Sequence, residues 1–269
     1  MKKEKEMDTT TLTPQTCNNM KFINKILQGD CLELMKDITD GSIDMILCDL
    51  PYGTTACKWD VIIPFEQLWV QYKRIIKPNG AIVLTASQPF TSTLVMSNLK
   101  MFKYEWIWEK HQGTNPMSAK ISPLKSHENI VVFSKGKTIY NPQMEIGKPY
   151  NGFSSDKTQS EVYGGGKSVH RDNKDGSRYP KTVLKFTKDK GKRIHPTQKP
   201  VLLFEYLIKT YTNEGDLVLD NCAGSATTAI AALNTNRRCI CMEKDETYFE
   251  VGKKRVEEHI KSLKGKLLK

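Results

Sequence analysis

The sequence predicts an α/β fold in which helices cover both faces of a mostly parallel sheet. Short apolar runs alternate along the chain with segments whose apolar residues recur at the helical period. The chain has 269 residues, of which 38% are hydrophobic, and this is enough for one domain of that class with a sizeable insertion. Acidic residues follow several apolar runs, at positions where ligands gather in such sheets.

Apolar runs with the length and composition of buried strands occur along most of the chain. They span residues 25–27, 44–48, 81–85, 130–133, 217–219 and 239–242. Segments with helical periodicity fall between and after them, at residues 65–76, 201–211, 227–234 and 247–263. In the first of these, Phe65, Leu68 and Tyr72 share one face, and the Pro78 and Gly80 that follow are typical of a helix end.

Two stretches depart from this alternation. Residues 1–20 are polar and lack an apolar period, which predicts a mobile N-terminal arm. Residues 135–194 hold 14 Lys or Arg against 6 Asp or Glu, so most of the net charge of +11 falls there. This stretch is either a solvated, partly disordered loop or a basic surface that follows phosphates. Residues 21–134 and 195–269 then form the two parts of one folded domain.

Charge and cysteine pattern narrow the classes of function. The excess of Lys and Arg favours a polyanionic partner such as nucleic acid. No apolar run approaches the roughly 18 residues of a membrane span, and no apolar stretch follows the charged N-terminus, so we expect a cytoplasmic protein without a membrane segment. The 7 cysteines include no Cys-x-x-Cys pair and the 5 histidines are dispersed, which predicts no disulfide framework and no metal site.

Four acidic residues stand directly after predicted strands. They are Asp30, Asp49, Asp220 and Glu243. Because the carboxyl ends of parallel strands meet at one edge of a sheet, we expect these side chains to lie along one rim. Any one of them by itself is equally well explained as a solvated turn residue.

Asp220 opens a turn of small residues that leads into the predicted helix at 227–234. Small side chains let the backbone approach a ligand closely, and a helix N-terminus favours an anionic group such as a carboxylate. Glu243 follows 19 residues after Gly224, at the place where an acid accepts hydrogen bonds from ribose hydroxyls. The pair indicates a nucleoside-containing cofactor; the alternative is a simple tight connection between strand and helix.

The motif Asp49-Leu50-Pro51-Tyr52 places a carboxylate, a rigid turn and an aromatic ring in succession. The exocyclic amino group of a nucleobase is a poor nucleophile, because its lone pair is delocalised into the ring. The Asp49 carboxylate and the Leu50 carbonyl can accept both amino hydrogens and draw the nitrogen toward tetrahedral geometry. Pro51 fixes the backbone, and Tyr52 can stack on the base. Without further context the motif is also an ordinary turn containing proline.

The order of three motifs resembles that of the amino-methylating DNA methyltransferases of the beta class. The motif at 49–52 comes first, His-Pro-Thr-Gln-Lys-Pro at 195–200 second, and Asp220-x-x-x-Gly-Ser225 last. Intervening segments agree, among them residues 28–30, 41–44, 77–80, 106–110 and 127–129. The resemblance covers roughly residues 22–134 and 194–259, which is most of the chain.

The resemblance implies a Rossmann-like, S-adenosylmethionine-dependent methyltransferase fold with a seven-stranded sheet whose last two strands form an antiparallel hairpin. Residues 21–134 would be the catalytic part and residues 195–269 the cofactor-binding part. Residues 135–194 would be a basic target-recognition insertion between them.

The resemblance also implies roles for single residues. Asp49, Leu50, Pro51 and Tyr52 would form the catalytic loop, with the flipped base stacked on Tyr52. The cofactor would contact Asp30 with its adenine, Glu243 with its ribose, Thr197 and Lys199 with its carboxylate, and Asp220, Cys222, Gly224 and Ser225 with its methionine end. Three positions depart from the usual family residues: Leu50 replaces Pro, Cys222 replaces Phe, and Ala226 replaces Gly. The last two bear on cofactor affinity.

We therefore expect a DNA methyltransferase that moves a methyl group from S-adenosylmethionine to N6 of adenine in a specific DNA sequence. In the family, Asp at the position of Asp49 accompanies adenine more often and Ser accompanies cytosine. An N4-cytosine or RNA amino-methyltransferase would share the same acidic residues, and Cys222 and Ala226 leave room for a nucleic-acid-binding protein on a degenerate methyltransferase fold. DNA is the expected partner, in a restriction-modification setting, with a homodimer and a cognate restriction nuclease left open.

Overall fold

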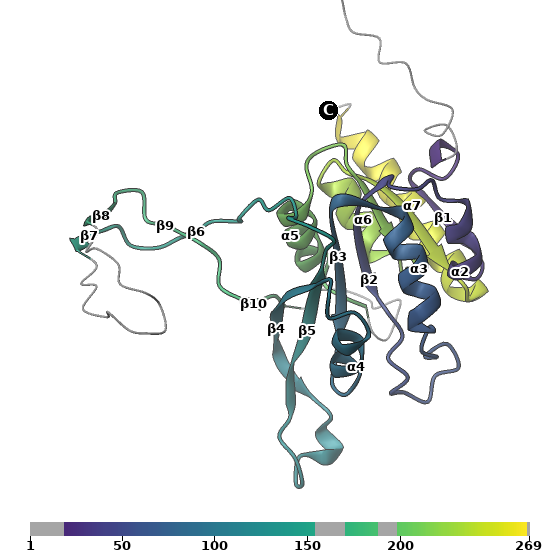
Figure 1. Cartoon of the computed structure of the whole chain (residues 1–269), viewed down its shortest axis with the longest axis horizontal. Coiled ribbons are helices and arrows are strands. Elements are labelled where there is room, and N and C mark those ends of the chain that lie inside the picture. The colour runs from purple at the N-terminus through teal and green to yellow at the C-terminus, as the bar shows by residue number, and fades with distance from the viewer. Residues whose placement is uncertain (1–18, 154–169, 188–197, 268–269) are drawn as a thin grey trace, which may run out of the picture. The chain divides into compact units, whose positions relative to one another are not determined.

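A computed structural model describes residues 19–153, 170–187 and 198–267 (Figure 1). The chain divides into two compact units, one formed by residues 1–141 together with 182–269, the other by residues 142–181. The smaller unit lies within the stretch 135–194 that the sequence sets apart. The predicted N-terminal arm falls almost entirely outside the described residues.

An eight-stranded sheet organises the described part of the larger unit, in the order β1-β12-β11-β2-β3-β5-β4-β10. Its strands are β1 (Lys25–Gln28), β2 (Ile43–Asp49), β3 (Ile76–Ala86), β4 (Phe102–Thr114), β5 (Lys125–Phe133), β10 (Val183–Lys185), β11 (Leu217–Asp220) and β12 (Arg238–Glu243). Only β5 runs against the others, pairing antiparallel with both β3 and β4. The mostly parallel sheet predicted from the sequence is confirmed.

The sheet differs in two respects from the one that the resemblance implies. Its strands number eight rather than seven, because β10 adds to the edge in parallel with β4, with Val183 opposite Ile107. The antiparallel hairpin of β4 and β5 stands in the middle of the chain rather than at its end. The later strands β11 and β12 instead join the sheet on the far side of β2, in parallel.

Helices cover both faces of the sheet, as predicted. One face carries α2 (Cys31–Leu34), the 3-10 turn η1 (Met35–Asp37), α3 (Phe65–Ile75) and α4 (Phe90–Ser97). The other carries α5 (Val201–Tyr211), α6 (Thr227–Asn234) and α7 (Glu246–Leu267). A second 3-10 turn, η2 (Pro116–Ser118), lies between β4 and β5. Among residues 19–153, 170–187 and 198–267, no helix is long and apolar enough to cross a membrane.

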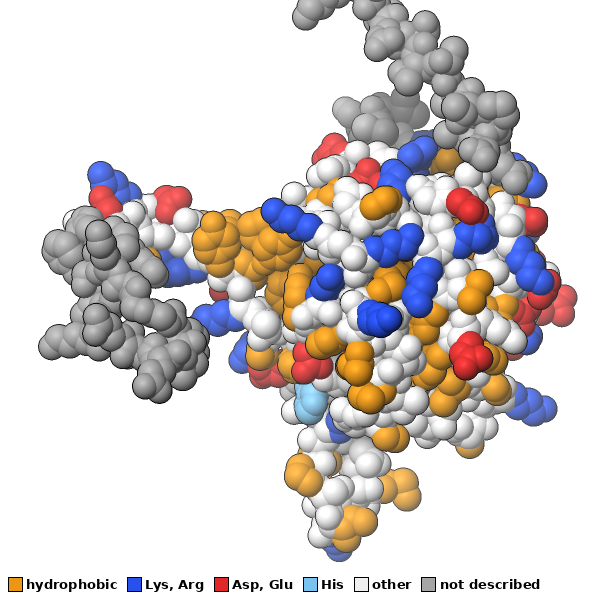
Figure 2. Space-filling view, in the orientation of Figure 1, with side chains coloured by type: hydrophobic (Ala, Val, Ile, Leu, Met, Phe, Trp, Pro, Cys, Tyr) orange, Lys and Arg blue, Asp and Glu red, His pale blue; other side chains and the backbone are white. Residues whose placement is uncertain are grey.

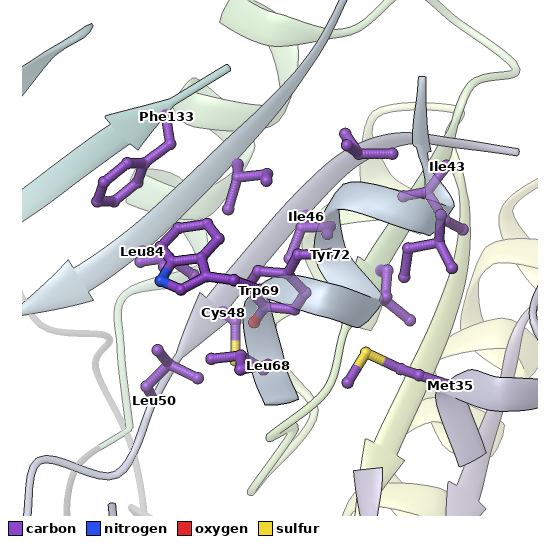
Figure 3. Close-up of a cluster of buried hydrophobic side chains, with 14 of the residues drawn as sticks. Met35, Ile43, Ile46, Cys48, Leu50, Leu68, Trp69, Tyr72, Leu84 and Phe133 are labelled. Atoms are coloured by element: carbon purple, nitrogen blue, oxygen red, sulfur yellow. The ribbon is translucent and has the colours of Figure 1, made fainter. Parts of the chain in front are cut away.

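Strand β2 shows why the core strands are continuous apolar runs. Its side chains alternate between two buried clusters: Ile46 and Cys48 pack under α3, and Met45 and Leu47 pack on the opposite face. Figure 3 shows the first cluster, where Trp69 from α3 lies over the strands. A strand that is buried on both faces has no solvated side, so its sequence lacks the apolar-polar alternation of a surface strand.

The smaller unit consists of two short antiparallel pairs in its described part. Strand β6 (Glu145–Ile146) pairs with β9 (Ser177–Arg178), and β7 (Tyr150–Phe153) pairs with β8 (His170–Asn173). The Arg178 guanidinium lies 4.5 Å from the centroid of the Tyr150 ring and fixes it.

Backbone hydrogen bonds hold both ends of this insertion on the larger unit. The chain leaves after Asn141, whose N–H donates to the Thr210 carbonyl at 2.7 Å. It returns at Thr182, whose carbonyl accepts from the N–H of Ile107 at 2.8 Å. Both anchors therefore belong to the larger unit, one on α5 and the other on β4.

Candidate functional site

A cavity of about 700 Å³ is formed where the parallel strands end. Its lining includes every predicted site residue that the structure describes: Asp30, Asp49, Leu50, Pro51, Tyr52, Lys199, Asp220, Cys222, Gly224, Ser225 and Glu243. Two parts of the chain that are far apart in sequence thus contribute to one site. Thr197 lies outside the described residues.

Glu243, at the end of β12, fastens the turn that follows β11. Its Oε2 accepts the N–H of Gly224 at 2.7 Å, and its Oε1 accepts the N–H of Asp245 at 2.9 Å. Burial raises the pKa of the Glu243 carboxyl above its usual value, although these backbone bonds oppose the shift. A carboxylate offers about four acceptor positions, so the Glu243 carboxylate still has one for a ligand hydroxyl.

Asp30, after β1, is a helix cap as well as a lining residue. Its Oδ1 accepts the N–H of Leu32 at 2.9 Å and caps α2, while its Oδ2 pairs with Lys244 at 3.0 Å. Although burial raises the pKa of this carboxyl, the bonds from Lys244 and Leu32 lower it below the usual value. Asp30 thus presents a charged, oriented carboxylate to the cavity.

Asp220, at the end of β11, is buried against the start of α6. It accepts hydrogen bonds from the Thr228 hydroxyl at 2.5 Å and from the N–H of Cys222 at 3.0 Å. Burial outweighs both bonds and raises the pKa of Asp220 to about 6.

Ala226, where the family usually has Gly, adopts a φ of 61°, a conformation that favours glycine.

The charge of the cavity is opposite to that of the chain. Its lining holds seven Asp or Glu residues and four lysines, whereas the whole chain carries +11. A local excess of carboxylates favours a cationic ligand. In the described part of the chain, no three His, Cys, Asp or Glu side chains gather as metal ligands.

Asp49, the last residue of β2, receives three hydrogen bonds. Its Oδ1 accepts from the Tyr52 hydroxyl at 2.8 Å and from the Thr85 hydroxyl, and its Oδ2 accepts from Lys199 Nζ at 2.5 Å. A carboxylate offers about four acceptor positions, so roughly one remains for a ligand N–H. The three donors fix the carboxylate in one orientation.

Lys199 is 6% exposed and stands between two carboxylates. Its ammonium lies 3.4 Å from Glu128 Oε2 as well as beside Asp49, and Glu128 also pairs with Lys110. Although burial lowers the pKa of Lys199, the two carboxylates raise it above its usual value. Burial likewise raises the pKa of Glu128, but the two lysines lower it. The resemblance implies that Lys199 lies near the cofactor carboxylate; in the structure its ammonium pairs with Asp49 and Glu128.

Asp60 shapes the loop that carries Tyr52. Its Oδ1 accepts the N–H groups of Tyr52 and Gly53, and its Oδ2 accepts those of Thr54 and Thr55, at 2.7 to 2.9 Å. Burial raises the pKa of Asp60, but these bonds lower it below the usual value. One carboxylate therefore satisfies four successive loop donors, and sequence reasoning missed it because a single Asp in a loop has no distinctive pattern.

Glu128 and Lys110 were also missed as site residues. They lie in segments that the resemblance includes, but only strand pairing shows their function: Glu128 stands opposite Trp108 in the β4–β5 ladder, which brings it to the cavity. Gln198 Oε1 is buried in this lining and accepts no hydrogen bond from a described residue. A buried acceptor that opens on a cavity is suited to a polar ligand.

The Tyr52 ring is held between neighbours. Phe90 stacks on it with ring centroids 5.1 Å apart and planes at 28°, and Lys199 Nζ lies 5.8 Å from its centroid. Burial and the nearby Asp49 carboxylate raise the pKa of the Tyr52 hydroxyl well above its usual value. The hydroxyl therefore stays protonated and continues to donate to Asp49 at neutral pH.

The chain is similar in sequence to DNA methyltransferases. Residues 43–254 match the N6/N4 family model described as DNA methylase. The type II methyltransferase M2.MboI of Moraxella bovis is 29% identical over 266 residues, covering 89% of this chain and 90% of that protein. The DNA adenine methyltransferase YhdJ of Escherichia coli is 26% identical, covering 90% of this chain and 86% of that protein.

Solved structures resemble it over similar spans. The M1.HpyAVI–SAM complex superposes with a TM-score of 0.60 at 25% identity, over 86% of this chain and 98% of that one. The cytosine-N4-specific PvuII DNA methyltransferase superposes with a TM-score of 0.58 at 14% identity, over 87% and 90%. The second likeness is one of fold alone.

Proposed function

The chain belongs to the N6/N4 DNA methylase family, and on that premise we propose that it methylates N6 of adenine in a specific DNA sequence. Its methyl donor is S-adenosylmethionine. The observation that carries the proposal is the position of Asp49: its oriented carboxylate borders the same cavity as the Leu50 backbone, the Tyr52 ring and the cofactor-side acids. A flipped base and a methyl donor would meet there.

The cavity suits S-adenosylmethionine in size and charge. Ligand pockets measure roughly 300 to 1,000 Å³, and the cavity of about 700 Å³ falls within that range. Its excess of carboxylates matches a cationic cofactor. Asp30, Asp220 and Glu243, with the turn at Gly224 and Ser225, are the residues that would hold it. When bound, the cofactor supplies a methyl group on a positively charged sulfur, open to direct displacement.

Asp49 and Leu50 would hold the amino nitrogen of the base. The remaining acceptor position of Asp49 takes one amino hydrogen and the Leu50 carbonyl takes the other. Positive charge would develop on this nitrogen as it takes the methyl group, and the Asp49 carboxylate would stabilise it. The methylated nitrogen would then release one of its two hydrogens as a proton. Tyr52 would stack on the base. Because Lys199 and Thr85 already fix the carboxylate, little reorganisation is needed during the reaction.

Adenine is proposed as the target for two reasons. Aspartate at the position of Asp49 accompanies adenine in the resembling family, and the similar E. coli protein is named a DNA adenine methyltransferase. Cytosine N4 is the competing target, because its amino group donates the same two hydrogens.

The proposal also includes a restriction-modification role and a DNA-recognition role for residues 135–194. M2.MboI is named a type II methyltransferase, which supports a restriction-modification role with a cognate nuclease as partner. The basic stretch 135–194 would contact DNA phosphates and select the sequence, with residues 21–134 supplying catalysis and residues 195–269 the cofactor site. A homodimer is a further association consistent with this role.

Nucleoside mass spectrometry tests the proposal. The chain is expressed in a host that lacks DNA methylation, and the genomic DNA is digested and compared with that from cells expressing Asp49→Ala. We expect N6-methyladenine with the native chain and none with the variant. N4-methylcytosine without N6-methyladenine would overturn the adenine assignment, and no modified base in DNA would overturn the proposed function.

A further inference from the structure

The hairpin of β4 and β5 projects beyond the sheet and ends in exposed apolar side chains. Figure 1 shows it extending away from the helices, and Figure 2 shows apolar side chains at its end. Met117 is 97% exposed and Ile121 is 88% exposed. Exposed large apolar side chains that gather on one projecting turn, rather than lying singly over a surface, are typical of an interaction site.

The tip is an ordered turn rather than a loose loop. The Thr114 hydroxyl donates to the Lys125 carbonyl at 3.0 Å and closes its base. Within the turn, the N–H of Ile121 donates to the Ser118 carbonyl at 2.9 Å. The backbone therefore presents Met117 and Ile121 to solvent in a fixed conformation.

The same hairpin lines the cavity. Lys110 and Thr114 on β4 and Glu128 on β5 are lining residues. A continuous piece of structure thus runs from the place proposed for the reacting base to the apolar tip.

The positive charge near the tip favours a negatively charged partner. Residues 111–127 contain two lysines and two histidines and no Asp or Glu, whereas Lys110 is buried and paired with Glu128. An apolar end with a basic stem is complementary to a duplex, in which stacked bases lie between rows of phosphates. A second copy of this basic chain offers no such complement of charge.

We propose that Met117 and Ile121 enter the base stack of DNA and occupy the space that the target base leaves when it flips into the cavity. The inference rests on the proposed function and extends it. Flipping breaks the stacking and pairing of the target base, and apolar side chains inserted between base steps offset part of that cost. The tip would therefore matter only when the target base is paired and stacked.

Two DNA substrates distinguish insertion into the base stack from a general contribution of the tip to DNA binding. Both carry the methylation sequence of the native protein, one as a normal duplex and one with a mismatched bubble across the target base and its neighbours, where the target is neither paired nor stacked. The variant Met117→Ser/Ile121→Ser is compared with Val70→Ser/Leu202→Ser, which changes residues 63% and 61% exposed on α3 and α5. Circular dichroism and S-adenosylmethionine affinity check that both variants fold.

We expect the tip variant to lose about tenfold or more in kcat/KM on the normal duplex and to stay within about twofold of native on the unpaired target. The control variant should match the native enzyme on both. Equal loss on the two substrates, or no loss on the duplex, would overturn the insertion. A native dimer that dissociates in the tip variant would make the tip a contact between copies and overturn it as well. A native protein that methylates neither substrate would instead refute the proposed function.

Discussion

The ammonium of Lys199 lies 2.5 Å from Oδ2 of Asp49, inside the cavity. Lys199 is buried and Asp49 is half-buried, and each is the counter-ion of the other; Glu128 supplies a second negative charge at 3.4 Å from Lys199. A buried charge that loses its partner is strongly unfavourable, so the pair fixes both side chains. Lys199 therefore orients the Asp49 carboxylate, and its place near the cofactor carboxylate stays a prediction of the resemblance.

This geometry predicts a selective effect of Lys199→Met. The Asp49 carboxylate would lose its fixed orientation, so we expect kcat to fall by about a hundredfold while the dissociation constant for S-adenosylmethionine changes by less than about threefold. Lys36→Met is the control, because Lys36 pairs with Glu33 outside the cavity lining. Single-turnover methylation and calorimetry measure the two quantities. If cofactor affinity fell as much as turnover, the prediction would be wrong and Lys199 would instead bind the cofactor carboxylate.

Asp60 predicts a graded effect on the catalytic loop. Asp60→Ala leaves four loop N–H groups without their acceptor and should lower the free energy of unfolding by about 3 kcal/mol and kcat by about a hundredfold. Asp60→Asn keeps one carbonyl acceptor and should fall between Ala and native. Asp216→Ala is the control, because it removes the side-chain acceptor of only one backbone N–H, that of Asn213. Equal activity of the native, Asn and Ala proteins would show that the loop does not need this carboxylate.

Asp220 predicts a pH dependence of cofactor binding. Its folded pKa of about 6 lies above the usual 3.8, so the folded protein holds the proton more tightly and its stability falls as pH rises from about 4 to 6. A cationic cofactor prefers the ionised carboxylate, and its affinity should therefore increase as pH rises through about 6. Asp220→Asn should flatten that increase. Calorimetry with S-adenosylmethionine between about pH 5 and pH 7 measures it, and an identical pH profile in the variant would assign the effect to another group.

The smaller unit predicts a salt-dependent DNA affinity. Lys148→Glu, Lys174→Glu and Lys181→Glu together should weaken binding and flatten the plot of log affinity against log salt by about 0.9 for each phosphate that is no longer neutralised. The control reverses Lys253, Lys254 and Lys261, which are exposed on α7. Fluorescence anisotropy with a labelled duplex gives both slopes. If the α7 variant changed the slope more, the basic insertion would not be the phosphate-binding surface.

The bounds of a helix could be predicted from the sequence where its apolar residues recur at the helical period and clear end signals flank them. Residues 201–211 and 227–234 are helices with the predicted bounds, because their apolar period coincides with clear ends. Strand β4 was missed: Trp106 and Trp108 are buried, but the polar residues around them conceal a strand that runs far past the sheet. Helix α4 was missed as well, since its Thr and Ser residues weaken any helical period and its packing on the strands decides its conformation.

The residues of the candidate site also fall into two groups, those that the sequence predicted and those that it did not. Asp49, Asp220 and Glu243 could be predicted because each follows a strand, and strand order then brings them to one cavity. Asp60 and Glu128 could not, because one depends on the folded path of a loop and the other on the register of β4 against β5. Spacing along the chain contains neither kind of information.

The backbone bonds at the two ends of residues 142–181 bear on how this segment can change during evolution. Asn141 and Thr182 are held by backbone bonds to α5 and β4, and those bonds do not depend on which side chains lie between them. Descendants of this chain can lengthen, shorten or replace residues 142–181 while both exit points stay in register. Asp49 and Lys199 lie outside this segment, so new versions of it can arise by mutation or recombination while the pair stays unchanged.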